Sequence, residues 1–237
     1  MLDSTFFVLT NPEIEALTLS VKVATFCALL ISVPAIAVAW LLAKKNFFGK
    51  SLLDGLVHIP LILPPVVPGF LLLMLLGNNG LVGKWLHNTF NITIAFTWVG
   101  AVIASAVMAF PLMVRSSRLA IGQVDPNLEK AAQGLGASKL RVFFTITLPL
   151  AMPGVLTGLI LAFSRSLGEF GATITFVGNI EGETRTLPLA IYTFTQMPNG
   201  DISAVRLVVI SVVIALFALT ASNILERKMI KRMGKES

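Results

Sequence analysis

The chain has 237 residues, of which 55% are apolar and only 13% are charged, and its formal net charge is +6. Soluble domains carry about 25% charged residues, so this composition excludes an ordinary soluble domain and indicates a protein whose solvent is lipid. We expect no nucleic acid among its partners, because the sequence has no basic stripe interleaved with aromatic residues.

Residues that could support catalysis or bind a metal are scarce. Cys27 is the single cysteine, which excludes a disulfide and a thiolate metal site within one chain. His58 and His87 lie far apart and match no metal-ligand spacing. Since there is also no nucleophile–base pair and no pair of carboxylates, we expect no catalytic residue, no metal and no enzyme activity. We expect no cleavable signal in the opening MLDSTFF, which begins with an acid and lacks a basic segment.

Five apolar segments are long enough to cross a bilayer, which takes about 20 residues as a helix. In chain order they are residues 14–43, 52–76, 92–114, 148–169 and 204–225. Helices are expected because lipid offers no partner for open backbone groups. The sequence therefore predicts an all-α integral membrane protein, with residues 1–237 as one transmembrane domain.

The basic residues orient these spans. Cytoplasmic loops carry an excess of Lys and Arg, and 13 of the 18 basic residues follow the first span, follow the third span or lie in the tail. They are Lys44, Lys45, Lys50, Arg115, Arg118, Lys130, Lys139, Arg141, Arg227, Lys228, Lys231, Arg232 and Lys235. We expect a multi-pass protein of the cytoplasmic (inner) membrane, with its N-terminus outside and its C-terminus in the cytoplasm.

The second segment contains four prolines, at positions 60, 64, 65 and 68. Proline removes a helical hydrogen bond and clashes with the preceding turn, so this helix must kink or open. Broken helices occur at membrane depth where they are buried in protein or line a cavity. Two interpretations stay open: a packing kink, or a gate along a translocation path formed by Pro64, Pro65 and Pro68.

Residues 115–147 form the predicted cytoplasmic loop after the third span. Asp125 followed by Pro126 is typical of a helix start, Gly134 and Gly136 interrupt that helix, and a second short amphipathic helix is predicted over residues 137–144. The loop could lie on lipid headgroups or dock in a groove of a soluble partner. Small residues favour docking, because they let another backbone approach; they are Ala131, Ala132, Gly134, Gly136 and Ala137.

Arg165 and Glu169 are four residues apart and can pair on one helix face. At about 1.5 Å per residue from Pro149, Arg165 would lie about 24 Å across the bilayer, near its outer boundary. The pair could be an interfacial packing contact, or with Ser166 it could form an outer gate beside the path of an anion. Residues 187–197 are too short to span and are expected to fold back at the outer side.

The loop DPNLEKAAQGLGASKLRVFFTITLP (residues 125–149) resembles the coupling loop in the membrane subunits of ATP-binding-cassette (ABC) importers. The positions that carry the resemblance are Glu129, Ala131, Ala132, Gly136, Ile146, Leu148 and Pro149. Lys130 stands where many members have Glu. In that family the loop is a coupling helix that sits in a cleft of the ATPase subunit. The resemblance implies ATPase-coupling roles for Glu129, Lys130, Ala131, Ala132, Leu135, Gly136 and Ala137.

Four further stretches resemble molybdate-transport permeases: FFGKSLLD (47–54), LPPVVPG (63–69), FPLMVRSSRLA (110–120) and LAFSRSLGEFGATITFVGNIEGETRTLP (161–188). This resemblance implies the type I ABC importer permease fold and a homodimer that carries molybdate, or also tungstate. Its partners would be two cytoplasmic ATPase subunits, which bind ATP and Mg²⁺, and an extracytoplasmic molybdate-binding protein. A sulfate or thiosulfate permease is the alternative, because both anions are tetrahedral dianions.

We expect no cofactor on this chain itself. A phosphate-binding loop needs G-x-x-x-x-G-K-[ST], but Gly49-Lys50-Ser51 has Lys44 at the first glycine position, and Gly83-Lys84 has Asn78 there. An ion channel or secondary transporter is a less favoured alternative, because the internal repeats that many secondary transporters carry are not evident.

Overall fold

The computed structural model describes residues 8–232, so the opening MLDSTFF and Lys235 of the basic tail lie outside the described residues. Every regular element in that range is helical. Four helices are long and apolar enough to cross a membrane, and a bent helix pair makes a fifth crossing if it counts as one span. The predicted all-α membrane fold is therefore confirmed.

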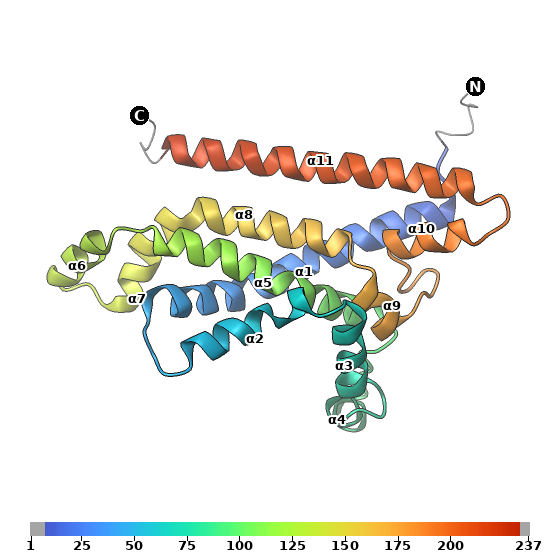
Figure 1. The fold of residues 1–237 in the computed structure, drawn as a ribbon, viewed down its shortest axis with the longest axis horizontal. Helices are drawn as coiled ribbons and strands as arrows, with labels where there is room; N and C mark the ends of the chain where they lie inside the picture. The colour runs from blue at the N-terminus through green and yellow to red at the C-terminus, as the bar shows by residue number, and fades with distance from the viewer. Residues whose placement is uncertain (1–7, 233–237) are drawn as a thin grey trace.

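Three helices form the centre of an elongated bundle (Figure 1). They are α1 (Asn11–Lys44), α5 (Trp98–Gly122) and α8 (Leu148–Leu167). Small residues at the contacts let these helices approach closely: a Cβ added to Gly154 of α8 would lie 2.4 Å from the Cβ of Ala120. The Ser116 hydroxyl donates to the Gly154 carbonyl at 2.7 Å. Much of the buried core consequently comes from alanines, among them Ala24, Ala35, Ala39, Ala101, Ala104, Ala109 and Ala162.

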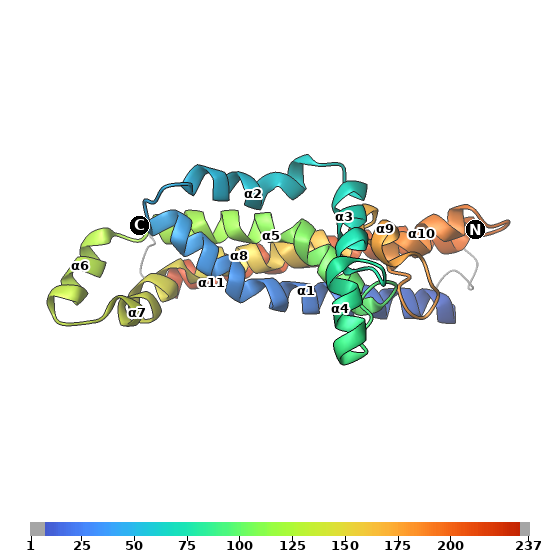
Figure 2. The same cartoon turned by 90° about the horizontal axis from the view of Figure 1, so that it is seen from below.

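The last long helix, α11 (Asp201–Arg232), runs along α8 and α10 (Leu187–Thr195), as Figures 1 and 2 show. It is joined to the start of α1 by a buried ion pair, in which Arg206 Nη1 lies 3.0 Å from Glu13 Oε2. The expected fold-back segment, residues 187–197, is mostly α10, which packs on α1 and α11. Its first amide, at Leu187, donates to the Ser20 hydroxyl of α1 at 2.6 Å.

The proline-rich segment is broken, as its prolines predict. In place of the predicted span 52–76, the structure has two helices, α2 (Lys50–Ile62) and α3 (Val66–Leu76). The chain bends by 110° between them. The break falls at Pro64 and Pro65, where two consecutive residues lack a backbone N–H. In Figure 1, α3 and the following α4 (Leu81–Phe90) stand away from the long axis of the bundle.

Several predicted boundaries differ from the structure. The third helix begins at Trp98 instead of residue 92, because the Thr97 side chain caps it by accepting from the Gly100 amide at 3.2 Å. It continues to Gly122, so residues 115–122 of the predicted loop belong to α5. The short helix expected over residues 137–144 is also not separate: α7 (Lys139–Val142) continues through a π-helical turn, Phe143–Thr147, into α8.

Candidate functional site

The loop between α5 and α7, which the sequence predicts to be the coupling loop, lies at one end of the bundle, beside the last turn of α1 (Figures 1 and 2). Its helix, α6 (Pro126–Gly134), begins where the Asp125 carboxylate accepts from the Asn127 amide at 2.8 Å. The helix ends in a tight turn in which the Ala137 amide donates to the Ala132 carbonyl at 3.1 Å. Gly136 has φ +91° in this turn, a conformation that favours glycine.

Glu129 points from α6 into the bundle and joins three segments. Its Oε2 lies 3.0 Å from Lys44 Nζ, at the end of α1, and its Oε1 accepts from the Thr147 hydroxyl at 2.6 Å, at the start of α8. Lys44 also donates to the Val124 carbonyl at 3.3 Å. We call Lys44, Glu129 and Thr147 the Glu129 cluster. Because both carboxylate oxygens are engaged within the chain, Glu129 holds α6 in place, and the neighbouring Lys130 is exposed.

Lys44 and Thr147 belong to this site, although neither was predicted from the sequence to be a site residue. Their positions offered a signal, since Lys44 ends the first span and Thr147 directly precedes the Leu-Pro that opens the fourth. Both lie on the predicted cytoplasmic side, where the loop also lies.

The outward face of the loop is small and apolar. Leu135 is 90% exposed, and a Cβ added to Gly134 or Gly136 would meet nothing within 4 Å. Packing inside this chain therefore does not require small residues at those two positions. The turn therefore presents Leu135 and an open backbone to its surroundings. Ala131 is also exposed, whereas Ala132 and Ala137 are half-buried.

The second candidate region lies at the opposite end of α8. Arg165 Nη1 lies 2.6 Å from Glu169 Oε2, and the Glu169 side chain is only 1% exposed. Glu169 Oε1 accepts from the Ala172 amide at 2.8 Å, in the first turn of α9 (Gly171–Val177). The carboxylate thus fixes the corner between α8 and α9, while Ser166 is buried and faces the Cys27 thiol of α1.

The proline break packs directly on this corner. A Cβ added to Gly69 of α3 would lie 2.6 Å from the Ala172 carbonyl oxygen, and one on Gly171 would lie 2.6 Å from the Pro65 Cβ. Pro68 is buried in the contact, and Pro64 and Pro65 are exposed. The structure therefore brings the proline break of α2–α3 against the corner that Glu169 fixes, although the two are about a hundred positions apart in the sequence. Ser166 does not take part in this contact.

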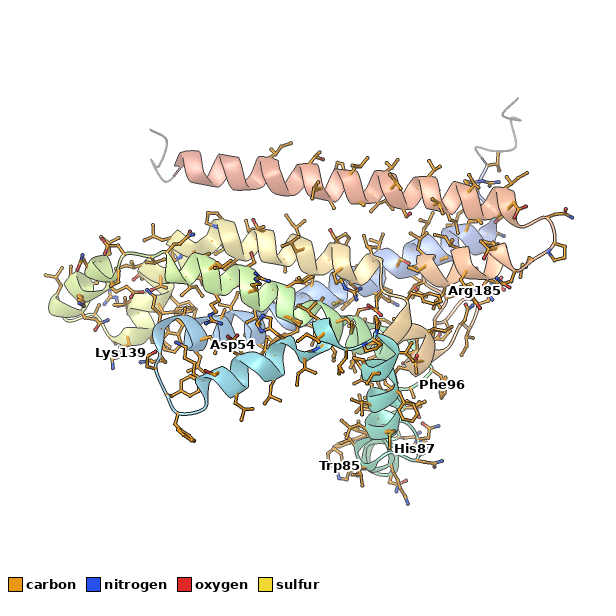
Figure 3. The ribbon with its side chains drawn as sticks, in the orientation of Figure 1. Asp54, Trp85, His87, Phe96, Lys139 and Arg185 are labelled. Atoms are coloured by element: carbon orange, nitrogen blue, oxygen red, sulfur yellow. The ribbon has the colours of Figure 1, made fainter. Side chains whose placement is uncertain are left out.

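A further polar contact joins α2 to α5, nearer to the end of the bundle where α6 lies. Arg118 Nη1 lies 2.7 Å from Asp54 Oδ1, and His58 Nδ1 lies 3.4 Å from the same oxygen. Figure 3 shows Asp54 at this position and Lys139 at the α6–α7 end, with Trp85 and His87 on the α4 arm. Among the described residues, no group of three or more His, Cys, Asp or Glu side chains could hold a metal ion.

Comparison with known proteins finds related transport permeases. The chain is 55% identical over 224 residues to the Molybdenum transport system permease protein ModB of Haemophilus influenzae. The matched region covers 94% of this chain and 97% of that protein. It is 35% identical over 229 residues to the Sulfate transport system permease protein CysT of Salmonella typhimurium, with 95% and 81% covered.

The fold resembles that of a solved bacterial ABC transporter involved in the import of the acidic polysaccharide alginate. The TM-score is 0.75 at 19% identity, with 96% of this chain and 84% of that chain covered. Residues 35–231 match the family described as the binding-protein-dependent transport system inner membrane component. The chain belongs to this family of inner membrane transport components.

Proposed function

We propose that this chain is the permease subunit of an ATP-driven importer that carries molybdate across the cytoplasmic membrane. The observation that supports this cargo is the identity of 55% with a molybdenum transport permease over nearly the whole of both chains, against 35% with a sulfate permease. Tungstate, a tetrahedral dianion of the same charge, is a second expected substrate.

Energy would enter through α6. Two ATPase subunits would bind ATP and Mg²⁺ and receive the exposed face around Leu135 of two permease copies. When the ATPase pair closes, α6 would move, and the Glu129 cluster would carry that movement to the ends of α1 and α8. This role follows from the cluster's contacts, because a movement of α6 that left α1 and α8 in place would break both hydrogen bonds of the carboxylate.

The path would form between two copies of the chain, since four or five spans are too few to enclose one. The α3 helix has large apolar side chains that this chain leaves exposed; they are Val66, Val67, Phe70, Leu71, Met74 and Leu75. We assign the outer gate to the contact between the α2–α3 break and the α8–α9 corner. There a conformational change would separate Gly69 from Ala172, near the charge of Arg165.

Delivery of the anion would depend on a binding protein at the outer side. With the N-terminus outside, the loop before α10 faces that side and contains Glu181 and Glu183, with Arg185 paired to Glu181 at 2.8 Å. This loop has no surplus of positive charge to collect a free dianion. The family's dependence on binding proteins fits that observation.

The deciding experiment is uptake of radiolabelled molybdate into proteoliposomes that contain the permease, its ATPase and its binding protein. We expect uptake to require ATP and the binding protein. Excess tungstate should inhibit this uptake, and excess sulfate should not. Uptake abolished by excess sulfate would indicate that the chain is a sulfate permease. An intact complex that imports neither anion would refute the proposed function.

A further inference from the structure

A basic cavity of about 160 Å³ lies beside the Glu129 cluster, between the end of α1 and the start of α7. Lys44, Lys45 and Lys139 line it, together with Glu129 and Trp40. The cavity belongs to neither the outward face of α6 nor the gate. The proposed function therefore gives this cavity no ligand.

The charges in this cavity do not balance. Glu129 is the acid that lines it, and both of its oxygens are already engaged by Lys44 and Thr147. Lys45 and Lys139 take part in none of the ion pairs of the described residues. Lys45 instead lies 5.4 Å from the centre of the Trp40 ring. The cavity thus carries a surplus of two positive charges, which fits an anion.

An apolar groove of about 350 Å³ adjoins this cavity and shares Trp40, Lys139 and Phe143 with it. Its other walls are Ala37, Leu140 and Phe144. Leu140 is 71% exposed and Phe144 is 57% exposed. A positive cavity beside an apolar groove has the two parts of a phospholipid site, one for the headgroup and one for an acyl chain.

We propose that the cavity and the groove together bind an anionic phospholipid of the cytoplasmic leaflet. Its phosphodiester would lie between Lys45 and Lys139, and an acyl chain would follow the groove along Phe143 and Phe144. Basic pockets between membrane helices on the cytoplasmic side bind lipid headgroups in this way. The inference rests on the orientation proposed above, which places this end of the bundle at the cytoplasmic leaflet.

The site has a consequence for coupling. Lys44 and Glu129 line the same cavity, so the bound headgroup lies against the cluster that holds α6. An anionic headgroup between Lys45 and Lys139 would lie close to Lys44, the lysine that positions Glu129. The lipid composition of the inner leaflet would thereby tune how firmly α6 is attached to the bundle.

The test uses Trp40 as a reporter, because it lines both parts of the site. Trp40, Trp85 and Trp98 are the three tryptophans of the chain, so the full-length variant with Trp85→Phe and Trp98→Phe reports from Trp40 alone. It is reconstituted in phosphatidylcholine vesicles with a small fraction of brominated phosphatidylglycerol, or with the same fraction of brominated phosphatidylcholine. We expect the anionic lipid to quench Trp40 at a mole fraction about 25-fold lower, since each of the two lysines contributes about fivefold in affinity.

Lys45→Gln with Lys139→Gln should remove this preference. The matched control, Lys50→Gln with Arg141→Gln, also removes two positive charges at the same end and should retain it. The proposal fails if the two lipids quench the parent equally, if the preference survives the Lys45 and Lys139 changes, or if the control also loses it. Loss of the preference in millimolar inorganic phosphate would indicate a site for a soluble anion and would also overturn it. The assay measures no transport, so its failure leaves the proposed cargo untouched.

Discussion

Replacing Glu129 with alanine should loosen α6 from the bundle. The Lys44–Glu129 pair is 3.0 Å long and each side chain is only 16% exposed, so we assign it about 1 kcal/mol, the upper end of the range for exposed ion pairs. The Thr147 hydrogen bond, at 2.6 Å, contributes about 1 kcal/mol more. The sum of about 2 kcal/mol corresponds to about a thirtyfold increase in local opening of α6.

Hydrogen exchange of the α6 amides, measured by mass spectrometry on the full chain in nanodiscs, tests this expectation. Exchange across residues 126–134 should accelerate about thirtyfold in Glu129→Ala and by a smaller factor in Lys44→Ala. Lys130→Ala is the matched control, because Lys130 is exposed on the same helix, and should leave exchange unchanged. Unchanged exchange in Glu129→Ala would refute the reasoning that this carboxylate holds α6.

Three further changes test the gate and the loop. Gly69→Ala should destabilise the solubilised chain by about 1–3 kcal/mol through overpacking, whereas Gly55→Ala, in open space on α2, should stabilise it by up to about 1 kcal/mol in thermal unfolding. Arg165→Ala should cost about 3 kcal/mol, because it leaves the buried Glu169 carboxylate unpaired, and adding Glu169→Gln should restore much of that loss. Gly136→Val should lower ATP-dependent uptake severalfold, since a positive φ costs a β-branched residue about 1–2 kcal/mol, while Gly136→Asn should retain most of it.

Contradicting results are equally specific. Equal unfolding of the Gly69 and Gly55 variants would mean that α3 and α9 are not in close contact. Full uptake by an Arg165→Ala variant would remove Arg165 from the gate. Normal uptake by Gly136→Val would show that the turn after α6 tolerates another backbone conformation.

Much of the fold was predictable because it depends on local properties. Apolar length predicted the spans, Pro64 and Pro65 predicted the break in the second segment, and Asp125 with Pro126 predicted the start of α6. The boundaries were less accurate, because hydropathy does not detect the Thr97 cap or the continuous helix through the π-helical turn.

In the candidate site too, contacts within one helix were predictable and contacts between distant segments were not. The sequence by itself determined a lipid-embedded helical chain, and it determined the Arg165–Glu169 pair, since residues four apart share a helix face. Only the tertiary structure decided that Glu129 faces inward, because its partner Lys44 lies 85 positions away. Likewise, only packing decided that Gly69 meets Ala172. Contacts between distant segments depend on how helices approach one another, and no local pattern of residues contains that information.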